Sequence, residues 1–189
     1  MKTTITILLL ISTFCSQAQE KEITVNEDQK EYAIFTSFGQ FIGSSGDEKG
    51  SISSFRIAPA LKLGNHWAVG LTTGVEWFDV TLLPVGPDIK YFLSSKNNGG
   101  FFLQGALGHS FPLEDASLEY AEILETNGGF FTNSHLGYVF PMKGNSKLFI
   151  SAGYHYQVSG HVQEHWIYRE LERKIKYNRF SVRIGMAIF

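Results

Sequence analysis

The chain has 189 residues, a formal net charge of −2 and one cysteine. This length suits a single domain, and the near-neutral charge gives no electrostatic reason to expect a nucleic-acid partner. Aromatic residues are abundant, with 16 Phe, 8 Tyr and 3 Trp alongside 19 Gly, yet the mean hydropathy is only −0.05. Apolar residues that are frequent but not continuous must alternate with polar ones, and this alternation is typical of transmembrane β-strands.

Residues 1–18 are predicted to form a cleavable signal peptide. Lys2 supplies a positive charge, residues 5–15 form a short apolar stretch, and Ser16 and Ala18 place small residues at the −3 and −1 positions of a cleavage site. The apolar stretch is too short for a spanning helix, which needs about 20 residues. Cleavage removes the only cysteine, which excludes disulfides, thiolate metal sites and cysteine nucleophiles. Residues 19–30 are then a short N-terminal extension, and residues 31–189 form the folded domain.

Residues 67–77 alternate most clearly. The apolar face carries Trp67, Val69, Leu71, Thr73, Val75 and Trp77. The opposite face carries Ala68, Gly70, Thr72, Gly74 and Glu76. Successive side chains of a strand point to opposite faces, and a strand of 9 to 11 residues crosses a bilayer at a tilt. The segment is therefore predicted to be a transmembrane strand.

Similar patterns predict seven more strands, at about 31–42, 54–63, 85–93, 101–110, 128–140, 148–158 and 180–188. Short turn-rich links at 64–66, 94–100 and 141–146 alternate with links at 43–51, 79–84, 112–127 and 159–176, which are mostly longer. We therefore predict an all-β fold, an eight-stranded antiparallel transmembrane up-and-down β-barrel with its short turns on the periplasmic side. Pro59 and Pro87 fall within proposed strands and are expected at bulges or strand ends.

This pattern resembles the small outer-membrane β-barrel families typified by the OmpA transmembrane domain and OmpX. The final strand, which ends in Phe189, is similar to the signal that the barrel-insertion machinery reads, although Phe189 shares the parity of Arg183 and Gly185 instead of the lipid-facing parity. The resemblance implies a monomeric protein in the outer membrane of a Gram-negative bacterium, in contact with outer-membrane lipid and lipopolysaccharide. It implies a structural or surface-interaction role, with no cofactor and no catalysis.

Charges of both signs fall on the face that we assign to the lumen. The main members of this predicted lumen network are Arg56, Glu76, Asp88, Lys90, His155 and Arg183, with Lys62, Gln104, Asn133, His135 and Gln157 on the same face. An eight-stranded barrel is just wide enough for side chains to fill, and buried charges require partners, so we expect the network to plug the lumen. A narrow pore, or an acid–base pair of Glu76 with His155, is the alternative. At the membrane interfaces the predicted aromatic anchors are Trp67, Trp77, Tyr154 and Tyr156.

Other motifs suggest chemistry less directly. Residues 161–165 match H-x-x-E-H, a zinc-protease pattern that works only on a helix, whereas here it lies in a predicted loop. The pairs His109–Ser110 and Ser134–His135 invite comparison with lipid A-modifying enzymes of the outer membrane, but adjacent residues of a strand point to opposite faces. The link 112–127 is acidic and the link 159–176 slightly basic, so the second could meet lipopolysaccharide phosphates.

Two alternatives remain open at this stage. A lipid A-modifying enzyme requires a His, Ser and carboxylate cluster at one rim of the barrel. A soluble lipocalin-like periplasmic binding barrel requires the apolar face to point inward and charged residues to point outward.

Overall fold

The computed structural model describes residues 31–45, 48–78, 80–93, 99–114, 123–142, 144–163 and 171–189. The predicted signal peptide and N-terminal extension lie outside these residues. All regular elements of the described chain are strands, and among the described residues no helix is long and apolar enough to cross a bilayer. The strands are β1 Glu31–Ser45, β2 Glu48–Leu63, β3 Trp67–Trp77, β4 Thr81–Phe92, β5 Gly100–Pro112, β6 Ile123–Asn127, β7 Gly129–Phe140, β8 Ser146–Gln163 and β9 Leu171–Ile188.

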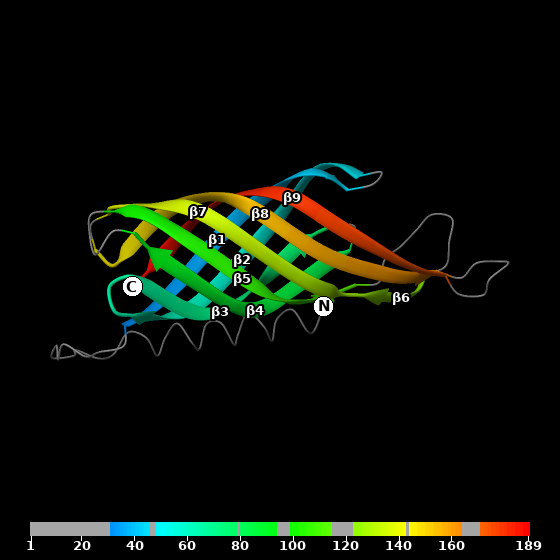
Figure 1. Cartoon of the computed structure of the whole chain (residues 1–189), viewed down its shortest axis with the longest axis horizontal. Helices are drawn as coiled ribbons and strands as arrows, with labels where there is room; N and C mark the ends of the chain where they lie inside the picture. The colour runs from blue at the N-terminus through cyan, green and yellow to red at the C-terminus, as the bar shows by residue number, and fades with distance from the viewer. Residues whose placement is uncertain are drawn as a thin grey trace, which may run out of the picture.

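Antiparallel pairing of β9 with both β8 and β1 closes the sheet into a barrel (Figure 1). Its wall has eight strands, because β6 and β7 both pair with β8 and form one wall strand that is interrupted at Gly128. The predicted eight-stranded antiparallel up-and-down barrel is therefore confirmed. The link predicted at 112–127 is too long, since its last five residues are strand β6. A register shift of one residue accompanies the interruption, as at a β-bulge.

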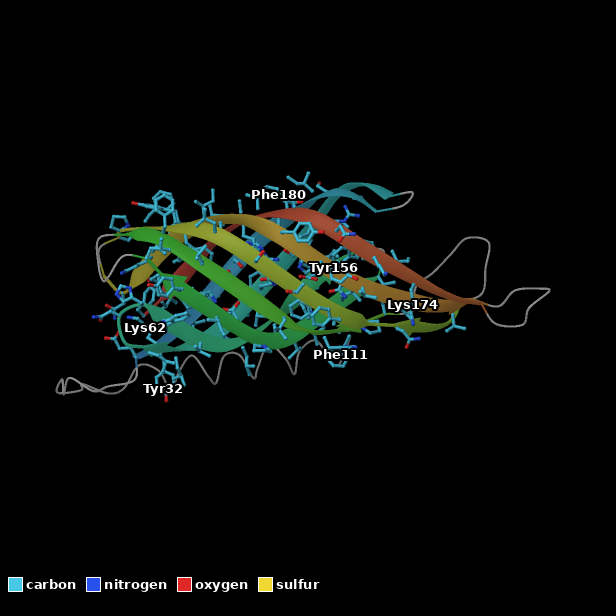
Figure 2. All side chains as sticks on the ribbon, viewed as in Figure 1. Tyr32, Lys62, Phe111, Tyr156, Lys174 and Phe180 are labelled. Atoms are coloured by element: carbon cyan, nitrogen blue, oxygen red, sulfur yellow. The ribbon has the colours of Figure 1, made fainter. Side chains whose placement is uncertain are left out.

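The two ends of the barrel differ in construction. At one end, here the turn end, lie Glu31, Phe189, the turn at 64–66 and the strand ends at Phe92, Gly100, Phe140 and Ser146. Gly64 and Gly144 have the positive-φ conformation that glycine adopts readily. At the other, here the extension end, the β1–β2 and β8–β9 hairpins project beyond the wall (Figure 1). Figure 2 shows Tyr32 and Lys62 at the turn end and Lys174 near the extension end.

The projecting hairpins correct two predicted loops. The link at 43–51 is almost all strand, because the β1–β2 ladder continues to the pair Ser45 and Glu48. The link at 159–176 is likewise strand over 159–163 and 171–176, paired as far as Gln163 with Leu171. In the described residues, strands that extend beyond the wall therefore distinguish this end of the barrel.

Pro59 and Pro87 both lie inside strands without breaking the register. Each points outward and has a partner on one side, Ile34 on β1 for Pro59 and Leu71 on β3 for Pro87. On the other side, the described β2–β3 and β4–β5 pairings skip these positions and then resume in the same register. Each of these prolines is thus accompanied by two skipped pairing positions on one side of its strand, and neither lies at the bulge or strand end that we expected.

Side chains divide between an apolar outer face and a mixed interior. Most large hydrophobic residues of the wall point outward, such as Leu71, Leu107 and Ile184. Two hydrophobic clusters lie inside, one at each end. The turn-end cluster comprises Ala33, Phe35, Ala58, Ala60, Ala68, Phe102, Val139, Phe149 and Ala187, with Phe92 and Phe189 against it. The extension-end cluster comprises Phe41, Phe78, Val80, Leu82 and Tyr177, with Ile52 and Ile175 against it.

Candidate functional site

A polar layer occupies the interior between the two hydrophobic clusters. Strands β2, β3, β4, β7, β8 and β9 supply it, because alternate residues of each strand point inward. Its members are all buried: Arg56, Glu76, Asp88, Lys90, Asn133, His135, Ser151, His155 and Arg183. These residues include all six main members of the predicted lumen network.

Arg56, Glu76 and His155 form a contact group within the polar layer. The Arg56 Nε donates to Glu76 Oε1 at 3.0 Å, and the Arg56 Nη2 donates to the same oxygen. From β8, across the interior, His155 places Nδ1 3.4 Å from Arg56 Nη2 and Nε2 3.5 Å from Glu76 Oε2. Arginine can only donate hydrogen bonds, so Nδ1 of His155 is the acceptor in this contact. The neutral His155 ring therefore carries its hydrogen on Nε2, which faces the Glu76 carboxylate.

Aromatic rings enclose this contact group on the side of the extension end. The His155 ring stacks on Phe41 with centroids 4.5 Å apart and lies 6.3 Å from the ring of Phe78. The Arg56 guanidinium lies 5.5 Å from the ring centroid of Phe131. Rings at these distances exclude water and attract the cation through their π faces, so the ion pair is fixed in place and not solvated.

Asp88, Lys90 and Gln104 form a second contact group nearer the turn end. Lys90 Nζ donates to one oxygen of Asp88, and Gln104 Nε2 donates to the other. The Lys90 ammonium also lies 4.3 Å from the ring centroid of Phe35, which belongs to the turn-end cluster. This cation–π contact joins the polar layer to the cluster below it.

Arg183 belongs to neither contact group. Its Nε donates to Ser181 Oγ at 3.2 Å, and its guanidinium lies 5.4 Å from the ring centroid of Phe41. No carboxylate among the described residues forms an ion pair with it, and its Nη2 has no hydrogen-bond partner there. The structure thus joins five of the six predicted network residues into two groups and leaves the sixth apart.

Several interior residues were missed by the sequence analysis. Arg179 is buried and donates to the Gly43 carbonyl at 2.9 Å, and its parity with Ser181 and Arg183 was a usable signal. The interior phenylalanines were missed as well. Phe149, for example, shares the inward parity of Ser151, but parity alone did not predict an aromatic cluster inside the barrel.

The four aromatic residues predicted as interface anchors all lie on the outer face. Trp67 and Trp77 are half-exposed at opposite ends of β3, and the Trp67 ring lies 4.7 Å from that of Tyr91. Tyr154 is half-exposed and donates through its hydroxyl to Asn178 Oδ1 at 2.7 Å. Tyr156, on the same face of β8, is more covered.

The two histidine–serine pairs each divide between the faces of a strand. His109 points outward beside Phe111, while Ser110 points inward and donates to Gln157 Oε1 at 2.8 Å. Ser134 points outward and His135 inward, where Nδ1 lies 3.3 Å from the hydroxyl of Ser151. The contact of His135 with Ser151 is buried inside the barrel, away from the lipid at either rim. Neither histidine–serine pair therefore forms the His, Ser and carboxylate cluster at one rim that a lipid A-modifying enzyme requires.

The H-x-x-E-H segment is only partly described. Residues 161–163 belong to β8 and pair with residues 171–173 of β9, so this part is extended and not helical. Residues 164 and 165 lie outside the described chain. In the described part of the chain, no three His, Cys, Asp or Glu residues are placed to hold a metal ion.

Phe189 points into the turn end of the barrel. Its ring meets Phe35 edge-on at 5.8 Å, and the ammonium groups of Lys62 and Lys147 lie 4.8 and 5.1 Å from its centroid. Its backbone N–H donates to the Asn145 carbonyl at 3.0 Å. The unusual parity of Phe189 therefore reflects an inward side chain at the barrel end, without a bulge in the described β8–β9 register.

Comparison with solved structures finds similar barrels. The outer membrane protein OprG from Pseudomonas aeruginosa superposes with a TM-score of 0.65 at 9% identity, over 84% of this chain and 95% of OprG. Neisserial surface protein A (NspA) gives a TM-score of 0.53 at 16% identity, over 83% of this chain and 96% of NspA. No family model and no curated protein sequence matches the chain. The likeness at these identities concerns the fold.

Proposed function

We propose that this chain is an integral outer-membrane protein of a Gram-negative bacterium, with a structural or surface-interaction role and no catalytic activity. Its barrel crosses the bilayer as a monomer, its lumen is plugged by side chains, and its extension end meets the cell exterior. Proposed partners are outer-membrane lipid, lipopolysaccharide and, through the strand ending in Phe189, the barrel-insertion machinery.

The inside-out distribution of side chains carries the proposal. Leu71, at the centre of β3, is 59% exposed, whereas Glu76 on the same strand is fully buried. Soluble monomers rarely expose a contiguous apolar patch above a few hundred Å², but here apolar side chains cover the outer face of the wall. A lipocalin-like barrel needs the reverse arrangement, while lipid contact accounts for this one.

The interior supports a plugged lumen. An aromatic cluster lies at each end, and between them the polar layer is held by the ion pairs of Arg56 with Glu76 and Lys90 with Asp88. Eight strands leave room only for side chains, so an ion that entered from either end would have to displace packed rings.

Unpaired strand edges support the surface-interaction role. In the described residues the β1–β9 pairing ends at Ile42 and Phe180, although β1 continues to Ser45. The β2–β3 pairing ends at Ser54 and Glu76, although β2 begins at Glu48. Such edges present free backbone donors and acceptors that can add a strand from a partner. Exposed Lys174 and Lys176 on β9 would face anionic headgroups there.

Heat-modifiability on a detergent gel of the outer-membrane fraction tests the membrane assignment. We expect a band whose mobility changes on boiling, because a closed barrel resists detergent until it is heated. A protein found only in the soluble periplasmic fraction, with unchanged mobility, would disprove the assignment and favour the lipocalin-like alternative.

A pair of variants adds a residue-level test. Leu71→Lys should destabilise the protein by about 2–4 kcal/mol if Leu71 faces the bilayer midplane. Asn145→Lys, in an exposed turn at the rim, is the control and should stay within about 0.5 kcal/mol. Equal stability of both variants and the parent protein would indicate that Leu71 faces water.

A further inference from the structure

The charges of the polar layer do not balance. Among the described residues it holds three cations, Arg56, Lys90 and Arg183, and two carboxylates, Glu76 and Asp88. Each carboxylate forms an ion pair, with Arg56 and Lys90 respectively. Arg183 is the surplus cation of the polar layer.

Neighbouring residues on β1 and β2 make room for the Arg183 side chain. A Cβ at Gly39, directly opposite on β1, would lie 2.7 Å from Arg183 Cγ and 3.1 Å from Ser54 Oγ. The glycine therefore gives the arginine side chain room to cross β1 and approach Ser54, whose hydroxyl has no described partner. Phe41 covers the guanidinium with its ring.

Further unpartnered groups lie on the neighbouring strands. Ser151 is paired with Arg183 across β8 and β9, and its hydroxyl contacts His135 Nδ1. His135 Nε2, the side-chain amide of Asn133 and Arg183 Nη2 all lack a described partner, and all three residues are at least 96% buried. Guanidinium, amide N–H, hydroxyl and imidazole N–H groups are all donors. Among the described residues, the unpartnered acceptors of the polar layer are Asn133 Oδ1 and Glu76 Oε2, and Glu76 already forms its ion pair with Arg56, so the charge of Arg183 has no carboxylate of its own.

We propose that the polar layer binds one small monovalent anion of the size of chloride, held by Arg183. A buried charge without a counterion is strongly destabilising, and a buried polar group without a hydrogen-bond partner destabilises the folded state as well. One monovalent anion neutralises the single surplus charge and accepts from the free donors. A cation would add to the surplus, and water would leave it uncompensated.

The test compares urea unfolding of the folded protein in detergent micelles in sodium chloride and in sodium gluconate at equal ionic strength. Gluconate is too bulky for the packed interior, so chloride should stabilise the parent protein selectively. For one site, each tenfold rise in chloride above the dissociation constant raises the folding equilibrium constant by roughly tenfold.

Two variants remove the need for the anion in different ways. Ser181→Asp supplies a carboxylate two residues before Arg183, which is the spacing that Asp88 and Lys90 already use on β4. It should fold in gluconate and lose the chloride dependence. Arg183→Met removes the surplus cation and should lose the dependence as well, whereas Lys62→Met, with the same change in net charge at the rim, should keep it.

Equal unfolding of the parent protein in chloride and gluconate would overturn the proposal. So would a chloride effect that persists undiminished in Ser181→Asp, since it would then be a general salt effect. If Arg183→Met does not fold, Ser181→Asp decides the question alone. Crystals grown in bromide should show an anomalous peak beside the Arg183 guanidinium, and a lumen without that peak would overturn the proposal independently.

Discussion

The Arg56 guanidinium on β2 reaches diagonally to the Glu76 carboxylate on β3, over the position of Gly74. In the register Arg56 faces Gly74, and Glu76 faces Ser54. A Cβ at Gly74 would lie 2.0 Å from the Phe55 carbonyl oxygen and 3.0 Å from Arg56 Cγ, so this glycine permits both the close approach of the β2 backbone and the path of the arginine side chain. Small residues on the inner face thus determine which charges can meet.

Removing Arg56 should be among the most damaging single changes in the barrel. Arg56→Met leaves the Glu76 carboxylate fully buried without its ion-pair partner, with His155 Nε2 at 3.5 Å as its remaining contact. Breaking a buried pair in this way costs about 3–5 kcal/mol. The double variant Arg56→Met with Glu76→Gln should recover most of the loss, because no uncompensated charge remains. Urea unfolding in one detergent measures all three proteins.

Lys62→Met is the matched control for Arg56→Met. Lys62 pairs with Glu31, whose side chain is 55% exposed, and exposed pairs contribute only about 0–1 kcal/mol. An Arg56→Met variant as stable as Lys62→Met, or a double variant no more stable than Arg56→Met, would contradict the importance of the buried pair.

The two hydrophobic clusters should act as barriers in series. Phe35 contacts Phe92, Phe149 and Phe189 in the turn-end cluster, and Phe41 contacts Phe78 in the extension-end cluster. In planar bilayers we expect the parent protein, Phe35→Ala and Phe41→Ala to stay silent, and the double variant to conduct. Each substitution costs about 3–5 kcal/mol, so a retained heat-dependent mobility shift must accompany every recording.

Two results would contradict this arrangement. A single variant that conducts as well as the double one would leave only one barrier. A double variant that is folded but silent would make the polar layer the barrier instead of the rings.

The sequence predicts the barrel wall well, because one face of each wall strand meets lipid and the other meets the lumen. This requires apolar and polar or small side chains to alternate along the strand. For this reason β3 begins and ends where predicted, at Trp67 and Trp77. Beyond the wall no such constraint acts, so the ends of β8 and β9 read as loop in the sequence although they pair. Strand β6 was missed for the same reason.

The contacts between interior side chains depend on strand register and barrel diameter, which the alternation of residues along a strand does not reveal. Parity puts Arg56, Glu76 and Arg183 on the inward face, but it does not predict which of them touch. Arg56 meets Glu76 because β2 and β3 have a particular register, and His155 joins them from β8 across the barrel. Register and diameter are properties of the closed sheet, so the unpaired state of Arg183 could not be read from the chain.

The orientation of the barrel can be tested with single cysteines, because the predicted mature chain has none. Leu113→Cys lies next to β5 at the extension end, and Asn65→Cys lies in the turn between β2 and β3. With a membrane-impermeant maleimide on intact cells, Leu113→Cys should be labelled and Asn65→Cys should be labelled only after lysis. The reverse pattern would move the unpaired strand edges to the periplasm and remove the basis for a cell-surface role.

Glu114 should make the extension end sensitive to acid. The N–H of Thr81 donates to Glu114 Oε1 at 3.1 Å, and the Thr81 hydroxyl donates to the same oxygen. These two hydrogen bonds, the side-chain one above all, hold the pKa of this exposed carboxyl below its ordinary value. A lowered pKa in the folded state means that the contact is fully formed above the ordinary pKa and is lost as the pH falls through the lowered one. The Thr81 amide resonance should therefore titrate below the ordinary glutamate range and become flat in Glu114→Gln. A titration at the ordinary pKa, or one that survives the substitution, would show that Glu114 does not hold the first residue of β4.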